Sequence, residues 1–300
     1  MDHVIATKQL HFKYGSDYVI QNLDINLHEN QLIGLIGRNG SGKTTFMKLC
    51  AGLLQPSHGE LQVFGQAPEN HLEILQNITY CSPGIVHRES NTLERIIDNF
   101  ALFYPALDRR FADKLMQCFS LSPGLKYKSL SQGMASLFHL ICALSTRAKL
   151  TMLDEPVTGM DISVRKTIYE IILRDYMEHP RTMIISSHIL SELEELLGEI
   201  LIIASGRVVL YGSTDEIKAM AYRIDGSREA VSAYIKGRSV LHEIHSITGS
   251  YAIIHQPYDE KAGNDAAAMN VTVSRVRPEE LYVYLTADGK ERDLECLWEN

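Results

Sequence analysis

LIGLIGRNGSGKTT, residues 32–45, joins a short apolar segment to a glycine-rich loop. Its first five residues are typical of a buried strand, and a helical pattern that begins at Lys43 is expected to run over 43–54. Residues 37–44 fit G-x-x-x-x-G-K-[ST], a loop whose backbone N–H groups surround phosphate oxygens at the N-terminus of a helix. The segment therefore predicts a strand, a phosphate-binding loop and a helix in direct succession.

The loop contains the residues that we expect to hold the phosphates of a nucleotide. Lys43 has the length and the charge to reach the β- and γ-phosphates, and the Thr44 hydroxyl is expected to bind Mg²⁺. Glycines in such a loop allow the tight turn that points successive N–H groups at an anion. The other expected nucleotide-binding residues are Gly37, Asn39, Gly40, Ser41, Gly42 and Thr45.

A second apolar segment, residues 150–153, ends in the acidic pair Asp154 and Glu155. In α/β folds, ligands bind at the carboxyl ends of the strands, so Asp154 is expected beside the phosphate loop. Its carboxylate can hold Mg²⁺ through water, and Glu155 can accept a proton from the attacking water. The pair therefore predicts a hydrolytic site.

Strand and helix patterns alternate along most of the first 221 residues. This alternation predicts an α/β fold with a mainly parallel sheet, an antiparallel β flap before it and a helical subdomain at about 84–145. Residues 222–300 change character and are expected to form a small accessory α+β domain. The flap is expected over 3–31, further strands over 182–186 and 199–204, and further helices over 162–178 and 189–197.

Composition indicates an ordinary globular chain, with 45% hydrophobic and 22% charged residues. The net charge of -8 and the lack of long Lys/Arg blocks do not favour nucleic acid as a partner. The sequence has no leader-like start and no apolar run long enough to span a bilayer. Scattered cysteines without a CxxC pair favour the cytosol: Cys50, Cys81, Cys118, Cys142 and Cys296.

These motifs, over about residues 3–217, resemble the nucleotide-binding subunits of ATP-binding-cassette (ABC) transporters, and the resemblance identifies the expected fold as an ABC cassette of the P-loop NTPase class. It implies that Tyr14 stacks on adenine, with Phe12 as the alternative ring. Leu130-Ser131-Gln132-Gly133-Met134 stands at the place of the family signature Leu-Ser-Gly-Gly-Gln, and it keeps the serine and the second glycine. In the family, this serine and glycine face the γ-phosphate bound to the opposite subunit, which makes Ser131 and Gly133 nucleotide-binding candidates.

Two further positions match family motifs. Residues 157–161 resemble the D-loop, which implies that Asp161 acts across a dimer interface. His188 follows the strand-like run 182–187 and matches the switch histidine that contacts the γ-phosphate. The resemblance therefore assigns catalysis to Glu155, His188 and Lys43.

One family motif is missing. The glutamine of the family's glutamine loop falls on Ser82 or Pro83, and neither side chain can act as an amide. Coupling between nucleotide and membrane subunit is then expected to run through a neighbouring residue, a water molecule or a backbone carbonyl.

The resemblance implies an ATP-hydrolysing motor that works as a head-to-tail dimer of cassettes, either a homodimer or a heterodimer. ATP and Mg²⁺ are its expected cofactors, and a separately encoded transmembrane permease is its expected partner. The chain is then peripheral on the inner face of the membrane and takes part in export, as in bacterial ABC-2-type systems. Two alternatives are a soluble ABC ATPase acting on ribosomes or DNA and a weakly catalytic regulatory subunit.

Overall fold

The computed structural model describes residues 3–69, 71–194, 196–246 and 249–286. The chain forms two compact units, Met1–Tyr211 and Gly212–Asn300. Helix α7 (Thr214–Ala219) packs against α10 (Pro278–Thr286), which places it in the second unit, although the sequence puts the boundary after residue 221. Cys296 and the end of the segment 222–300 lie outside the described residues.

A six-stranded sheet with the order β5-β6-β7-β3-β8-β9 forms the centre of the first unit. Five of its strands pair in parallel, as β5–β6, β6–β7, β7–β3 and β3–β8, which confirms the mainly parallel core. Because the carboxyl ends of parallel strands share one edge, the residues that follow β3, β6 and β7 come together there. The strands are β3 (Leu32–Ile36), β5 (Ile78–Cys81), β6 (Leu150–Leu153), β7 (Thr182–Ser187), β8 (Glu199–Ala204) and β9 (Arg207–Ser213).

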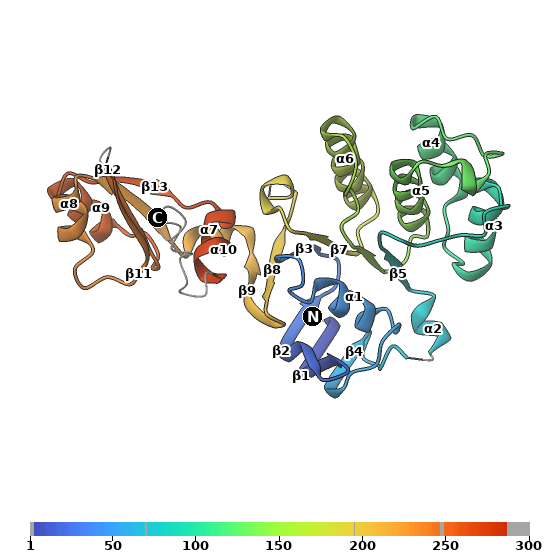
Figure 1. The fold of residues 1–300 in the computed structure, drawn as a ribbon, viewed down its shortest axis with the longest axis horizontal. Helices are drawn as coiled ribbons and strands as arrows, with labels where there is room; N and C mark the ends of the chain where they lie inside the picture. The colour runs from blue at the N-terminus through green and yellow to red at the C-terminus, as the bar shows by residue number, and fades with distance from the viewer. Residues whose placement is uncertain (1–2, 70, 195, 247–248, 287–300) are drawn as a thin grey trace, which may run out of the picture. The chain divides into compact units, whose positions relative to one another are not determined.

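Helices cover both faces of this sheet, with α1 (Lys43–Cys50) on one side and α5 (Gln132–Ser145) and α6 (Ile162–Glu178) on the other (Figure 1). Helix α1 ends before the expected residue 54, because Gly52 adopts a positive φ of 69°. The helix expected over 189–197 was wrong: among the described residues of this range, 189–194 and 196–197, only the short 3₁₀-helix η2 (Leu190–Glu192) forms. The Ser187 hydroxyl bonds both backbone groups of Ile189 and holds that residue extended, at φ -120°.

The antiparallel flap is a three-stranded sheet with the order β2-β1-β4, formed by β1 (His3–Tyr14), β2 (Asp17–His28) and β4 (His58–Val63). Its alternating buried residues share one apolar core with α1 and the six-stranded sheet. Helix α1 contacts both β2 and β4, so the flap encloses the helix that follows the phosphate loop.

A helical part lies beyond β5 and consists of α3 (Leu93–Phe103), α4 (Arg109–Cys118), η1 (Tyr127–Ser129) and α5 (Figure 1). Thr92, Asp108 and Ser131 cap the three α-helices by accepting backbone N–H bonds. The short α2 (Leu72–Leu75) precedes β5 and packs against it. None of the helices in the described ranges is both long and apolar enough to cross a membrane.

The second unit is a small α+β domain, as expected. Its strands form a four-stranded antiparallel sheet with the order β11-β12-β10-β13, the arrangement of a ferredoxin-like βαββαβ fold. The fully buried Tyr234 anchors its core. Its elements besides α7 and α10 are β10 (Tyr222–Gly226), α8 (Arg228–Tyr234), β11 (Val240–Ser246), β12 (Gly249–Ile254), α9 (Glu260–Ala268) and β13 (Thr272–Arg275).

Candidate functional site

Two glycines of the loop between β3 and α1 lie so close to neighbouring atoms that a side chain would not fit. A Cβ atom on Gly37 would lie 2.4 Å from both Ser41 Oγ and the Ile203 carbonyl oxygen. Gly42 has φ 109°, and its Cβ would lie 2.8 Å from the side chain of Ile20. The sequence therefore leaves this loop as bare backbone around an open concavity of about 170 Å³.

Two polar groups in the loop fit an anionic ligand. The buried Lys43 ammonium donates to the carbonyl oxygens of Gly37 and Arg38 at 2.6 and 3.4 Å. Burial lowers the pKa of Lys43, while the nearby Glu155 and Asp154 carboxylates act to raise it. Ser41 Oγ is buried without a protein partner. A phosphate group would give both groups a charged acceptor, so the residues present fit a nucleotide.

Asp154, only 2% exposed, follows β6 and accepts hydrogen bonds from three hydroxyl groups. The Thr44 and Tyr80 hydroxyls donate to its Oδ2 at 2.8 and 3.1 Å, and the Ser186 hydroxyl donates to Oδ1 at 2.6 Å. The parallel register of β6 with β5 and β7 places Tyr80 and Ser186 beside it.

Glu155 lies between Lys43 and His188. Its carboxylate oxygens lie 3.6 Å from Lys43 Nζ and 3.0–3.1 Å from His188 Nδ1, while its backbone N–H donates to Ser186 Oγ at 2.8 Å. Glu155 lines the loop concavity and also a second cavity of about 200 Å³ beside His188. Its φ of 46° is unusual for a non-glycine residue, and the surrounding bonds hold it in that conformation.

Tyr14 is the exposed ring of the predicted pair. It is 51% exposed at the end of β1, whereas Phe12 is 7% exposed and packs edge-on against it, with ring centroids 4.8 Å apart. Phe12 pairs with Ile20, whose side chain touches Gly42. Tyr14 is therefore the more accessible of the two rings.

The signature residues do not line these cavities. Ser131 caps α5 by accepting the Met134 N–H at 3.3 Å, and Gly133 faces the Gly159 carbonyl. Asp161 precedes α6, is exposed, and makes no side-chain cap bond. Ser131, Gly133 and Asp161 line neither cavity, so the site gathers Lys43, Thr44, Asp154, Glu155 and His188 without them.

Sequence reasoning missed Tyr80 and Ser186, the two hydroxyls that flank Asp154. Burial and the Asp154 carboxylate raise the pKa of the Tyr80 phenol, so it stays a hydrogen-bond donor. Both residues stand near the ends of apolar, strand-like segments of the sequence. To identify them as neighbours of Asp154, the register between the strands is needed.

Thr44 and Asp154 are the groups that fit Mg²⁺. Hard cations prefer oxygen ligands, and Mg²⁺ is commonly bound by one or two carboxylates together with substrate phosphates and water. No cluster of three or more metal-binding His, Cys, Asp or Glu side chains occurs in the parts of the chain that the structure describes. A hydroxyl-carboxylate pair beside a phosphate loop matches that mode of binding.

Comparison with known proteins gives the same assignment. Residues 20–158 match the family described as "ABC transporter". The chain is 31% identical over 223 residues to the bacitracin transport ATP-binding protein BcrA of Bacillus licheniformis, covering 73% of this chain and 72% of BcrA. It is 28% identical over 225 residues to the Nod factor export ATP-binding protein I of Cupriavidus pinatubonensis, covering 71% of this chain and 67% of that protein.

Among solved structures, one described as the ATP binding subunit of an ABC transporter superposes with a TM-score of 0.64 at 24% identity, covering 72% of this chain and 92% of that one. This likeness shows the fold. Together with the identity to BcrA and the loop, acidic pair and histidine gathered at one sheet edge, it shows that this chain belongs to the ABC transporter family, among its ATP-binding proteins.

Proposed function

We propose that this chain is the Mg²⁺-dependent ATPase motor of a transporter, with Glu155 as general base, and that it drives a separate membrane permease. The observation that carries the proposal is the position of Glu155. Its carboxylate lies between the Lys43 ammonium and His188 and lines both cavities, where a base must stand to meet water at the end of a bound triphosphate. This placement favours a catalytic cassette over a regulatory one.

Each residue then has a distinct task. Lys43, Thr45, Ser41 and the N–H groups from Gly37 to Gly42, including Asn39 and Gly40, bind the phosphates, and Tyr14 stacks on adenine. Thr44 and Asp154 hold Mg²⁺, whose positive charge neutralises phosphate oxygens when it is bound. Glu155 takes a proton from water at one carboxylate oxygen, His188 Nδ1 orients that carboxylate, and the His188 ring contacts the γ-phosphate.

The absence of Ser131, Gly133 and Asp161 from the linings of both cavities supports action as a dimer. The N-terminus of α5 carries unpaired backbone donors and partial positive charge, which suit a phosphate supplied by another subunit. A second cassette, identical or different, would present its signature to this chain's nucleotide. Closure of the two cassettes around ATP is the proposed power stroke.

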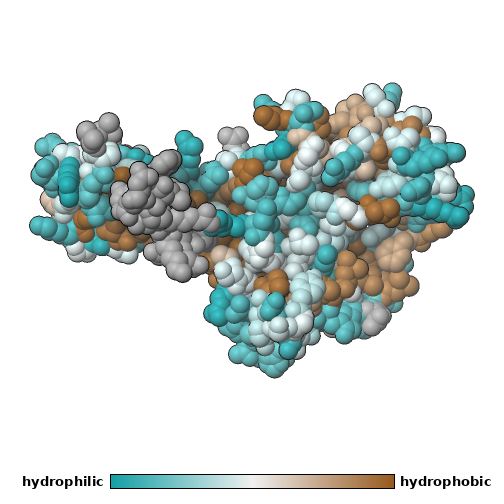
Figure 2. Space-filling model, in the orientation of Figure 1, coloured by the Kyte–Doolittle hydropathy of each residue, from teal (hydrophilic) through white to brown (hydrophobic). Residues whose placement is uncertain are grey.

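An exposed apolar surface supports a permease partner. Tyr104, directly after α3, donates to the Ile78 carbonyl at 3.0 Å and so fixes the end of α3 beside β5, which α2 also contacts. Figure 2 shows hydrophobic side chains on this part of the first unit. The exposed apolar residues of α2, α3 and the segment between β5 and α3 are Leu72, Val86, Leu102 and Phe103.

Export is the proposed direction, because a relative of this chain is an export protein by name. The proposal places the chain at the inner face of the cell membrane, held there by its permease. The cargo would be chosen by that permease.

Nucleotide binding and phosphate release by the purified chain test this function. The wild type should bind ATP and release phosphate when Mg²⁺ is present, and Lys43→Ala should lose both, because the loop loses the ammonium group that would bind the terminal phosphates. Unchanged ATP affinity in Lys43→Ala would contradict the assignment of the loop. Absence of phosphate release by the wild type, even with its permease and partner cassette, would contradict the ATPase.

A further inference from the structure

Tyr80 reaches the acidic centre of the site from the neighbouring strand. Its hydroxyl donates to Asp154 Oδ2 at 3.1 Å, and its backbone pairs with Met152 in the parallel β5–β6 register. The same oxygen of Asp154 accepts from Thr44 at 2.8 Å. The hydroxyls of Thr44 and Tyr80 therefore both donate to the same carboxylate oxygen of Asp154.

The other side of the Tyr80 hydroxyl faces the loop after β5. Hydrogen bonding by the Ser82 side chain acts to lower the pKa of the Tyr80 phenol, and Ser82 is one of the two residues at the place of the absent glutamine. A phenol donates one proton and can accept another, so Tyr80 can donate to Asp154 while it accepts from Ser82. The Tyr80 hydroxyl thus joins Asp154, through a hydrogen bond of 3.1 Å, to the part of the chain that contains Ser82.

We propose that Tyr80 is a positioning residue for Asp154 and that Ser82, Tyr80 and Asp154 together supply the link that a glutamine would otherwise make between the loop and the metal site. This inference rests on the proposed function and adds to it a route by which the loop senses that site.

Packing favours a fixed position for this hydroxyl. The Tyr80 ring is half-buried and packs against the main core cluster, so its hydroxyl cannot swing away without disturbing that core. Asp154 is buried and accepts only from hydroxyl groups in the described contacts. If Thr44 turns its oxygen toward a cation, Tyr80 and Ser186 remain to orient the carboxylate.

Tyr80→Phe removes the hydroxyl and keeps the ring. Tyr104→Phe is the matched control, because the Tyr104 hydroxyl binds the Ile78 carbonyl of the same strand and does not touch Asp154. The probe is Mn²⁺ bound together with ADP and followed by its electron paramagnetic resonance signal. ADP affinity in EDTA gives a metal-free readout, and thermal unfolding shows whether each variant is folded.

Tyr80→Phe should weaken Mn²⁺ binding about tenfold or more, as expected for losing one hydrogen bond to a charged group. Its metal-free ADP affinity should stay within about twofold of wild type, and Tyr104→Phe should keep both affinities. Wild-type Mn²⁺ affinity in Tyr80→Phe, or an equal loss in Tyr104→Phe, would overturn this inference alone. A wild-type protein that binds neither ADP nor Mn²⁺ would overturn the proposed function and this inference with it.

Hydrogen exchange tests the loop end of the link without relying on activity. Addition of Mn²⁺ and ADP should change the exchange of amides over residues 82–88 in the wild type. Both Tyr80→Phe and Ser82→Ala should lose that change, and its persistence in both variants would show that the loop does not sense the site through these residues.

Discussion

Ser186 joins the two acidic residues of the site through one hydroxyl. It donates to Asp154 Oδ1 at 2.6 Å and accepts the Glu155 N–H at 2.8 Å. Ser186→Ala should lower the free energy of unfolding by about 1–3 kcal/mol, because a buried carboxylate and a backbone N–H each lose a partner. It should also slow phosphate release, since Glu155 loses its anchor. Urea unfolding and steady-state phosphate release measure the two effects.

Ser145→Ala is the control for this prediction. Ser145 is fully buried, and its Oγ has no hydrogen-bond partner, so the variant removes a buried hydroxyl without breaking a contact. The prediction fails if Ser186→Ala is as stable and as active as Ser145→Ala.

The sequence identifies site residues where a motif fixes their spacing along the chain. Lys43 and Thr44 follow from one loop motif, and Asp154 and Glu155 follow from the end of one strand. Ser186 lies near them only because β6 and β7 pair in parallel register. Contacts between residues of neighbouring strands depend on that register, which no single motif specifies.

At the scale of elements, a buried ionic group joins α5, α6 and β7. The Asp175 carboxylate of α6 accepts from Arg181 at 2.6 Å and from Arg147, and its side chain is 1% exposed. Asp175→Ala should lower the free energy of unfolding by about 3–5 kcal/mol, because it leaves two guanidinium groups without their shared buried anion. Chemical unfolding of the first unit provides the measurement.

Asp113→Ala is the comparison for Asp175→Ala. Asp113 pairs with Arg109 on an exposed face of α4, where an ion pair contributes only about 0–1 kcal/mol. Equal destabilisation by the two variants would show that burial does not set the strength of the Asp175 group.

A buried histidine connects α5 with the loop after β5. His139 Nε2 lies 3.1 Å from the Tyr127 hydroxyl, which donates to the Ile85 carbonyl. Burial, with a smaller effect from His87, lowers the pKa of His139 from 6.5 to about 4. The unfolded chain therefore binds more protons than the folded chain below about pH 6.5, so stability should fall as pH falls from there toward 4.

Unfolding free energies at about pH 7 and pH 5.5 separate the contribution of histidines, His87 included, from that of carboxylates, because carboxylates of ordinary pKa are still ionised at both. His139→Phe keeps a ring at the site and should lose part of the pH dependence. Replacement of the exposed His58 by Phe is the control and should retain it. Identical pH dependence in His139→Phe and wild type would rule out His139 as a source of the effect.

Apolar periodicity predicts the long elements well and the short ones poorly. Residues 162–178 form α6 as expected, because a long helical pattern can bury one continuous side. The segment 189–197 fails as a helix because one side-chain contact, from Ser187 to Ile189, outweighs local propensity. Contacts of this kind are specific to the fold and have no periodic signature.

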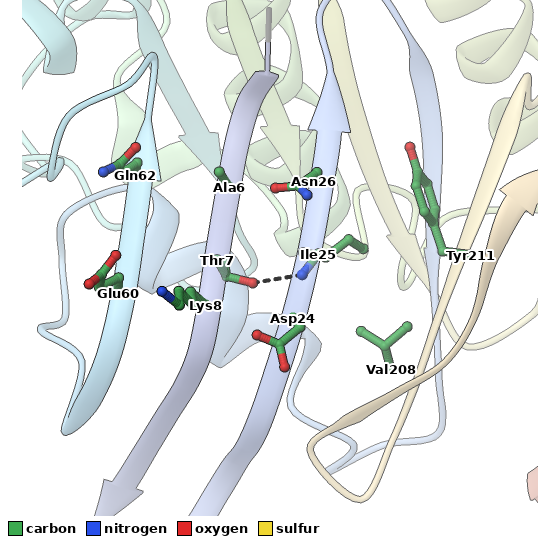
Figure 3. Close-up of a pocket in the computed structure, with 10 residues that line it drawn as sticks. All are labelled: Ala6, Thr7, Lys8, Asp24, Ile25, Asn26, Glu60, Gln62, Val208 and Tyr211. Atoms are coloured by element: carbon green, nitrogen blue, oxygen red, sulfur yellow. Dashed lines mark hydrogen bonds between the residues drawn. The ribbon is translucent and has the colours of Figure 1, made fainter.

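For the whole molecule, the central question is what completes the site. The first unit gathers the phosphate loop, the acidic pair and His188 at one sheet edge, but Ser131 lies outside both cavities. The second unit has its own core and a ferredoxin-like arrangement that the sequence did not specify, because no chemical motif marks its topology. A concavity of about 620 Å³ lies beside the three-stranded sheet, and no residue of the phosphate loop lines it (Figure 3).

A nucleotide bound between two subunits would therefore contact Lys43 of one subunit and Ser131 of the other. Ser131→Arg should prevent that assembly, because its side chain would occupy the space that a γ-phosphate needs next to the α5 N-terminus. If the chain works beside a different cassette, the assembly forms only when that partner is present, and both must then be examined together.

Glu155→Gln tests the account most directly, through phosphate release and light scattering on the same sample, with the partner cassette present if one is required. Gln keeps the shape and hydrogen bonding of Glu but has almost no basicity, so hydrolysis should fall about 10²- to 10⁴-fold while ATP and Mg²⁺ still bind. The stalled protein should then accumulate as an ATP-stabilised dimer that Ser131→Arg abolishes. Hydrolysis at the wild-type rate by Glu155→Gln would contradict the assignment of Glu155 as the base and the mechanism built on it.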